Sequence, residues 1–198
     1  MPTGHRPLPR PVGWREAVAR LDDRVDAAFD RLRGRRGADR LFYGASELAD
    51  FSLIWLILGA LRGLRSEHDW HAAVRVGGLL TVESLFVNLG VKSLFRRRRP
   101  SFEGTRPMKL RQPLSSAFPS GHASAAFCAA GLLSEDDPLW PVYYAVAGIV
   151  AASRVHVKIH HASDVLAGAA LGVVLGRVGR RLVPLPVRPV PAGHPIMG

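Results

Sequence analysis

The stretch VLAGAALGVVLG, residues 165–176, decides the fold class of this 198-residue chain. Wound into a helix, it is apolar on every side, whereas a surface helix of a water-soluble bundle keeps a polar face toward the solvent. Glycine and alanine recur through it, as is typical of membrane helices that pack closely against one another. The stretch therefore predicts a helix of a membrane protein and disfavours a soluble helical bundle.

Four other apolar segments precede the one that contains this stretch. The five segments lie near residues 41–62, 72–95, 120–134, 138–153 and 162–180. The third and fourth are shorter than the roughly 20 residues that an upright helix needs to cross the hydrocarbon core, so they could be tilted or span only part of it. We predict an all-α fold, an integral membrane helical bundle of about five transmembrane helices.

An amphipathic helix is predicted ahead of this bundle. In WREAVARLDDRVDAAFDRLRGRRG, apolar side chains recur at helical spacing, and Gly34 or Gly37 would end the helix. The helix could pack on the rest of the protein or lie on the bilayer surface. We expect no cleavable signal peptide, because the first residues lack an apolar region. The expected organisation is a basic segment with this interfacial helix (1–40), a transmembrane domain (41–183) and a disordered Pro-rich tail (184–198).

The composition argues against several classes of protein. Hydrophobic residues make up 47% of the chain, yet its formal net charge is +11. Nucleic-acid binding would account for the charge but not for the apolar runs, whereas a membrane protein facing anionic lipid head groups accounts for both. The single cysteine, Cys128, excludes an intramolecular disulfide and a cysteine-based zinc site. We expect membrane lipids as partners and no nucleic acid, and the sequence does not predict an oligomeric state.

The first of three polar clusters is KSLFRRRRP, in which six residues separate Lys92 from the pair Arg99 and Pro100. An arginine run beside an apolar segment is commonly a stop-transfer anchor. The alternative is a phosphate clamp, in which the lysine is a point charge and the forked guanidinium holds two phosphate oxygens. This cluster alone does not decide between the two.

The second cluster is AFPSGHASAAF, where a polar step precedes an apolar helix. Pro119 ends an extended segment, Ser120 can cap the helix, and Gly121 lets a ligand approach the backbone closely. The free N–H groups at such a helix start attract an anion. His122 could donate a proton to a leaving group at this position, or it could simply pack in the helical turn.

The third cluster is SRVHVKIHHASD, in which Arg154 offers another guanidinium. His160 and Asp164 are four residues apart, so on a helix they would share a face and the carboxylate could orient the ring. An imidazole held in this way keeps its other nitrogen free to attack phosphorus. His156 and His161 compete for the role, and we expect both to be lining or surface residues.

In order and spacing, the three clusters read Lys-x6-Arg-Pro, Pro-Ser-Gly-His and Ser-Arg-x5-His-x3-Asp. Together they resemble the type 2 phosphatidic acid phosphatase superfamily, which includes bacterial lipid phosphatases and shares its site with vanadium haloperoxidases. The resemblance covers roughly residues 70–180 and leaves out the N-terminal segment and the tail. Members of this family commonly have one more membrane helix than the apolar segments found here.

The resemblance implies a role for each matched residue. His160 would be the nucleophile that forms a phosphohistidine, Asp164 would hold its tautomer, and His122 would be the general acid. The phosphoryl oxygens would be bound by Lys92, Arg99, Ser120, the Gly121 backbone and Arg154. Because these groups and a helix N-terminus already supply positive charge at the phosphoryl group, we expect no metal ion and no other cofactor.

The implied activity is that of an integral membrane phosphatase that hydrolyses a phosphomonoester or diphosphate on a lipid. Substrates of the phosphatidic acid, phosphatidylglycerol phosphate and polyprenyl phosphate types all fit, including a polyprenyl-linked sugar phosphate. A vanadate-dependent haloperoxidase is an alternative, although the strongly apolar helices argue against it. A non-catalytic protein that binds anionic lipid is another, although it would not need a nucleophile, an aspartate and an acid histidine.

The charges of the loops predict an orientation in the membrane. Ten arginines fall in residues 1–40, and the loop that follows Lys92 adds more. Of the loops on the other side, one carries Arg62 and Arg65 against Glu67 and Asp69, and the next contains the acidic stretch 135–137. The positive-inside rule therefore favours a multi-pass protein of the cell membrane whose site faces the cytoplasm.

Three carboxylates lie within or at the ends of apolar segments: Glu47, Asp50 and Glu83. Intramembrane carboxylates are candidate functional residues. They could pair with Arg75 or Arg96 or contact a substrate head group, and the family motifs assign them no role.

Overall fold

The computed structural model describes residues 13–102, 106–111 and 115–187, which form helices and loops with no strand among them. The predicted all-α fold is thereby confirmed. In chain order the elements are α1 (Trp14–Asp30), α2 (Arg36–Leu48), η1 (Asp50–Ser52), α3 (Leu53–Gly63), α4 (Glu67–Leu85), η2 (Phe86–Gly90), η3 (Val91–Leu94), α5 (Gly121–Leu133), α6 (Trp140–His156) and α7 (Ala162–Leu182).

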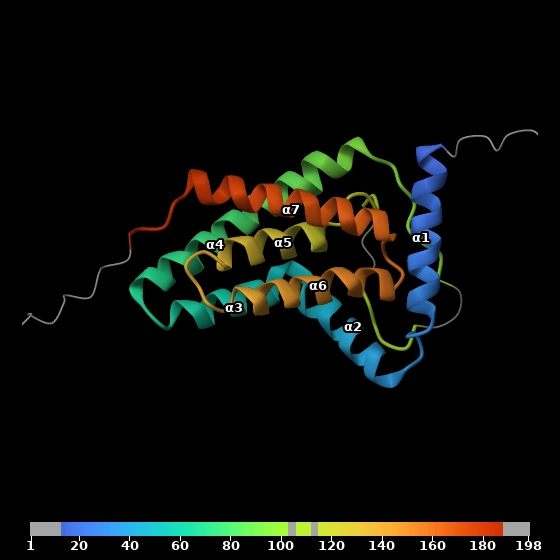
Figure 1. Ribbon diagram of the computed structural model, residues 1–198, viewed down its shortest axis with the longest axis horizontal. Helices are drawn as coiled ribbons and strands as arrows, with labels where there is room; N and C mark the ends of the chain where they lie inside the picture. Colours follow the sequence, from blue (N-terminus) through green and yellow to red (C-terminus); the bar gives the residue numbers. More distant parts are fainter. Residues whose placement is uncertain (1–12, 103–105, 112–114, 188–198) are drawn as a thin grey trace, which may run out of the picture.

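Helices α3 to α7 lie along the long axis of the molecule, and α1 stands across one end of them (Figure 1). Small and aliphatic side chains fill the core, including the fully buried Ala126, Ala129, Leu132, Ala147 and Val150. Large apolar side chains also cover the outside, including the exposed Leu56, Ile57, Leu85, Leu166 and Val174. A bundle that is apolar both inside and outside is suited to lipid rather than to water.

Within the described part of the chain, two helical stretches are long and apolar enough to cross a membrane. One is Glu67–Leu94, which joins α4 to η2 and η3, and the other is α7. The bent pair of α2 and α3 would be a third if it spans as one unit, and α5 is a shorter apolar helix. Each of the five predicted apolar segments is therefore helical, while the number of spans remains a prediction.

The segment predicted at 41–62 is not one straight helix, because the chain bends by 71° between α2 and α3. Phe51 and Ser52 at the bend have φ angles of 54° and 60°. Neither is glycine, so each left-handed conformation costs about 1–2 kcal/mol. Asp50 precedes them and, as described below, contacts the second polar cluster.

Helices α5 and α7 pack closely because glycines of α7 face the backbone of α5. A Cβ atom on Gly168 would lie 2.3 Å from the carbonyl oxygen of Ser120, and one on Gly172 would lie 2.2 Å from that of Ser124. These distances leave no room for a side chain, so the two helices approach as closely as their backbones allow. The close packing predicted from the small residues of this stretch is found at this contact.

Helix α1 packs on the rest of the protein instead of standing free. Its Val25 and Phe29 side chains contact a buried cluster that includes Ala151 and Val165 of α6 and α7. It ends at Asp30, before Gly34, whose φ angle of 81° favours glycine. Whether α1 also lies on the bilayer surface remains a prediction, and residues 1–12 and most of the predicted disordered tail (188–198) lie outside the described residues.

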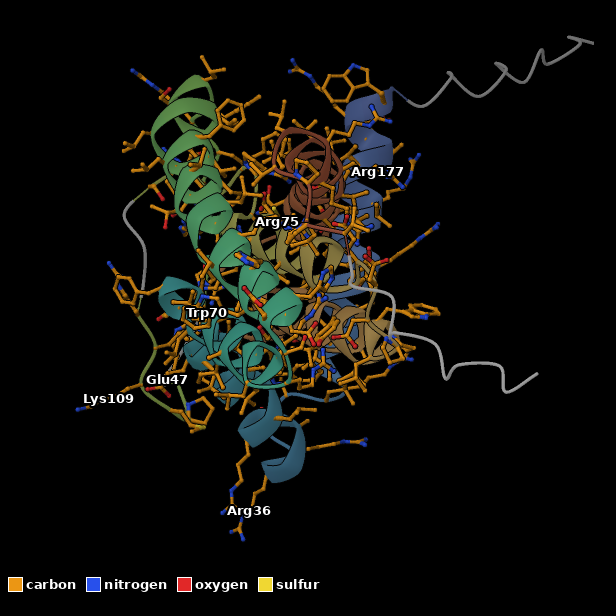
Figure 2. The ribbon with its side chains drawn as sticks, turned by 90° about the vertical axis from the view of Figure 1, so that its left-hand side faces the viewer. Arg36, Glu47, Trp70, Arg75, Lys109 and Arg177 are labelled. Atoms are coloured by element: carbon orange, nitrogen blue, oxygen red, sulfur yellow. The ribbon has the colours of Figure 1, made fainter. Side chains whose placement is uncertain are left out.

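Ion pairs close the end of the bundle opposite α1. The buried guanidinium of Arg62 lies 2.8 Å from the Asp69 carboxylate and 3.3 Å from that of Asp137. The buried Arg75 side chain (labelled in Figure 2) contacts Glu135 at 2.7 Å and donates to the Leu132 carbonyl. The suggested pairing of Arg75 with an intramembrane carboxylate is therefore wrong, because this guanidinium faces the loop between α5 and α6.

Candidate active site

The end of the bundle that faces α1 brings the three polar clusters together. Lys92 lies in η3, and His122 lies in the first turn of α5. Arg154 is in the last turn of α6, and Asp164 is in the first turn of α7. Clusters that are up to 72 residues apart in the sequence therefore form one site.

The start of α5 is built as predicted from the second cluster. Ser120 is the N-cap, and its side chain accepts a hydrogen bond from the Ala123 N–H. The Ser120 N–H donates to the Asp164 carbonyl oxygen at 3.0 Å, which joins the second cluster to the third. A Cβ atom on Gly121 would lie only 3.3 Å from the Lys92 Nζ atom, so the ammonium group of the first cluster lies against the helix start.

Arg154 is the most deeply buried cation of the site, at 1% exposure. Its Nη1 atom donates to the Ser46 hydroxyl of α2. Its Nε and Nη2 atoms have no hydrogen-bond partner among the described residues. Because buried donors are normally satisfied, these two are available to the oxygens of an anion.

Arg99 connects the first cluster to the third. Its Nη1 atom lies 3.3 Å from Nε2 of His160 and donates to the Ile159 carbonyl at 3.1 Å. Its Nη2 atom donates to the Ser115 carbonyl at 2.9 Å, which fixes the plane of the guanidinium. The arginine run is therefore more than a membrane anchor, because one of its members reaches the predicted nucleophile.

His160 lies in the loop between α6 and α7, because α7 begins only at Ala162. The prediction that His160 and Asp164 share a helical face is wrong, although they remain close. The His160 Nδ1 atom is 3.8 Å from the Asp164 carboxylate, which is longer than a hydrogen bond. Burial lowers the pKa of His160 well below its ordinary value, and the positive charges of Arg154, Arg99 and Lys92 lower it further. The imidazole is thus held neutral, as a nucleophile requires.

Asp164 is held by two other groups. Its carboxylate accepts a hydrogen bond from the His161 N–H at 2.9 Å, as in a capping box, and one from Arg97 at 2.7 Å. Arg97 also lies 2.7 Å from Asp22 of α1. Burial opposes ionisation of Asp22, but hydrogen bonds from Ser163 and Arg97 outweigh it and lower its pKa. The amphipathic helix is thereby linked to the site.

Arg97 was not among the predicted site residues. The run it belongs to follows η3 without helical structure, and the side chains of Arg97 and Arg99 are partly buried while Arg96 and Arg98 are exposed. In an extended chain, alternate side chains point to opposite sides. Arg97 is two residues from Arg99, and in an extended chain this spacing predicts that both side chains point to the same side, toward the site.

His122 is paired with a carboxylate that the motifs do not include. Its Nε2 atom is 2.7 Å from Oδ1 of Asp50. Of the other two carboxylates left without a role, Glu83 accepts a hydrogen bond from Ser124, and Glu47 is exposed. The pairing of Asp50 could not be read from the sequence, because it depends on the bend after α2.

The two competing histidines have structural positions. His156 is buried at 1% exposure, and its Nε2 atom is 2.8 Å from the Asp39 carboxylate. Its ring also packs against Phe42 and lines a pocket together with Arg33 and Tyr43, so of its two expected places, the lining position is confirmed and the surface position is wrong. His161 is the N-cap of α7. Neither replaces His160 beside Arg99.

The described residues contain no group of three or more His, Cys, Asp or Glu side chains placed to hold a metal ion. The positive charge of the site comes from Lys92, Arg99 and Arg154 together with the start of α5. That arrangement can hold a tetrahedral oxyanion beside a neutral imidazole. Metal-independent activity remains a prediction.

Comparison with known proteins identifies the family. The sequence model of the PAP2 superfamily matches residues 72–187. The chain belongs to this superfamily. The resemblance inferred from the three motifs is therefore confirmed, and the match omits α1, α2 and α3.

Named PAP2 relatives are lipid phosphatases. The chain is 30% identical over 138 residues to decaprenylphosphoryl-5-phosphoribose phosphatase of Mycobacterium tuberculosis. The aligned region covers 68% of this chain and 75% of the relative. The chain is 38% identical over 98 residues to lipid A 1-phosphatase of Porphyromonas gingivalis. This aligned region covers 47% of this chain and 20% of that protein.

Two solved structures share the fold. The transmembrane PAP2-type phosphatidylglycerolphosphate phosphatase of Bacillus subtilis has a TM-score of 0.61 and 24% identity, with 84% of this chain and 86% of that one covered. LpxE of Aquifex aeolicus has a TM-score of 0.61 and 22% identity, with 83% and 95% covered. At these identities the likeness establishes the membrane-bundle fold and nothing about the substrate.

Proposed function

We propose that the chain is an integral membrane phosphatase that hydrolyses a phosphomonoester or diphosphate on a lipid through a phosphohistidine. The observation that carries this proposal is the pair of unpartnered N–H donors on the buried Arg154, close to a neutral His160. Phosphoryl transfer requires positive charge where negative charge develops and a nucleophile in line with the leaving group. The site offers both.

In the proposed reaction, Nε2 of His160 attacks phosphorus, because this nitrogen faces Arg99 while Nδ1 faces Asp164. Arg99, Arg154 and Lys92 bind the phosphoryl oxygens together with the backbone at Gly121. His122 protonates the leaving oxygen and then takes a proton from the water that hydrolyses the phosphohistidine.

A lipid is the proposed substrate because the outside of the bundle is apolar while the site lies at its end. An acyl or prenyl chain can stay in the bilayer while the head group reaches the site. Phosphatidic acid, phosphatidylglycerol phosphate and polyprenyl phosphates fit this arrangement. Among these candidates we favour a polyprenyl-linked sugar phosphate, because the mycobacterial relative is named as a decaprenylphosphoryl-5-phosphoribose phosphatase.

The test is phosphate release by detergent-purified protein from phosphatidic acid, phosphatidylglycerol phosphate and a polyprenyl-linked sugar phosphate. We expect hydrolysis of at least one of these lipids at a rate that excess EDTA does not change, because the cations of the site are side chains. Release from none of them, or complete loss in EDTA that magnesium restores, would contradict the proposal. Peroxide-dependent halide oxidation with added vanadate would favour the haloperoxidase alternative instead.

We also propose that the protein crosses the cell membrane several times and that the site faces the cytoplasm. The N-terminal segment and the loop after Lys92 are rich in arginine. At the other end, Arg62, Arg65 and Arg75 are paired with carboxylates. The larger number of arginines on the side of the site therefore dominates the charge asymmetry that sets orientation.

This orientation can be tested by cysteine labelling in a variant in which the buried Cys128 is replaced by alanine. The exposed Arg98, at the site end, and Leu64, at the opposite end, are each replaced by cysteine. We expect a membrane-impermeant maleimide to label Leu64→Cys in intact cells and Arg98→Cys only after permeabilisation. Ready labelling of Arg98→Cys in intact cells would place the site outside.

A further inference from the structure

The bend between α2 and α3 places Asp50 beside His122. The Asp50 Oδ1 atom lies 2.7 Å from the His122 Nε2 atom, and the two side chains are 21% and 19% exposed. Asp50 lies outside residues 72–187, which match the family. The pair is therefore a feature of this chain that the family motifs do not describe.

The end of α2 makes a second contact with the site. Ser46, one turn before Asp50, is fully buried and accepts a hydrogen bond from Arg154. The bend follows directly after these two residues, and in it Phe51 and Ser52 adopt left-handed backbone conformations. Strained backbone of this kind persists where the surrounding structure holds it and is common at functional sites.

The contact with Asp50 fixes the orientation of the His122 ring. In the described part of the chain, the only hydrogen bond of this ring joins Nε2 to Asp50. A carboxylate accepts hydrogen bonds, so Nε2 carries a proton and donates it to Asp50. The Nδ1 atom is then the ring nitrogen that can exchange a proton with a substrate.

The charges around the ring come from every side of the site. Arg154 of α6 and Lys92 of η3 act on His122, and Arg111 and Arg154 act on Asp50. Burial and these positive neighbours both disfavour a protonated imidazole at His122, and a carboxylate in contact with the ring offsets part of that effect. Among the groups that act on His122, Asp50 is the carboxylate in contact with it.

We propose that Asp50 is a positioning residue for the general acid: it holds the Nε2–H of His122 so that Nδ1–H faces the leaving oxygen. This inference rests on the proposed phosphatase function. As the His160–phosphorus bond forms and the phosphorus–oxygen bond of the lipid breaks, the Nδ1 proton passes to the departing alkoxide. In the second step, Nδ1 takes a proton from the attacking water, and the phosphorus–nitrogen bond breaks to release phosphate. Asp50 stays ionised throughout.

The test compares Asp50→Asn with wild type on two substrates that differ in their need for an acid. With phosphatidic acid, whose leaving group is an alkoxide, we expect kcat to fall about 10- to 100-fold with KM nearly unchanged. With p-nitrophenyl phosphate, whose leaving group departs without protonation, we expect a loss of about threefold or less. His122→Ala should show the same dependence on the leaving group with larger losses.

The matched control is Glu47→Gln, which removes an exposed carboxylate three residues before Asp50, at the end of α2 (labelled in Figure 2), and should leave both rates unchanged. The thermal unfolding midpoint is measured for each variant. Equal losses on both substrates, or full activity of Asp50→Asn with phosphatidic acid, would overturn the role of Asp50. If wild-type protein hydrolyses neither substrate and no other lipid phosphate, the proposed function itself fails.

Discussion

Replacing His160 by alanine should lower the rate of phosphate release by about a thousandfold or more. The reason is that no other imidazole of the described residues is placed beside Arg99: His156 is held by Asp39, and His161 caps α7. Wild-type protein that is quenched during turnover with a 32P-labelled lipid phosphate should carry acid-labile label, and the variant should carry none. Phosphate release and label retention together are the measurement.

The matched control is His71→Ala, which removes an exposed histidine from α4. It should retain wild-type activity and labelling. A His160→Ala variant that folds and still releases phosphate at the wild-type rate would rule out the phosphohistidine and favour a protein that only binds anionic lipid.

Arg154→Lys should have the second-largest effect, a fall in kcat/KM of about 10²- to 10³-fold. A lysine keeps the charge but has a single nitrogen, whereas the guanidinium bonds Ser46 and still offers Nε and Nη2 to phosphate oxygens. Loss of these directed donors should weaken binding of the transition state more than that of the ground state. The inhibition constant for inorganic orthovanadate, a mimic of the transferred phosphoryl group, should rise with the loss of activity.

Arg98→Lys is the control for this change, because Arg98 is exposed within the same arginine run as Arg99. Its activity and orthovanadate inhibition should equal those of wild type. If Arg154→Lys were as active as Arg98→Lys, the unpartnered donors of Arg154 would have no part in binding the phosphoryl group.

The fold class and the three clusters that meet in the candidate site could be predicted from local features of the sequence. The run at 165–176 is apolar on all sides, and the spacing of the three clusters is a local property of the chain. Ser120 caps α5 as expected, because capping requires only a side chain and the N–H groups that follow it. Predictions of this kind depend on neighbours in the sequence and need no knowledge of tertiary contacts.

What could not be predicted depends on contacts between distant elements. Asp50 meets His122 only because the chain bends after α2, and neither Phe51 nor Ser52 signals a left-handed backbone. Arg97 reaches Asp164 only because α1 supplies Asp22 on its other side. The spacing of four residues between His160 and Asp164 led to a wrong prediction of a shared helical face. Such a spacing gives a shared face only where both residues are in one helix, and α7 starts after His160.

The glycine contact between α5 and α7 has a mechanical consequence. The Gly168 and Gly172 backbones touch carbonyl oxygens of α5, so these helices cannot slide past one another without a clash. Because His122 lies in the first turn of α5 and α7 begins just after His160, this closely packed pair of helices carries the proposed general acid and the proposed nucleophile. The separation of these two side chains is therefore set by the packing of the two helix backbones.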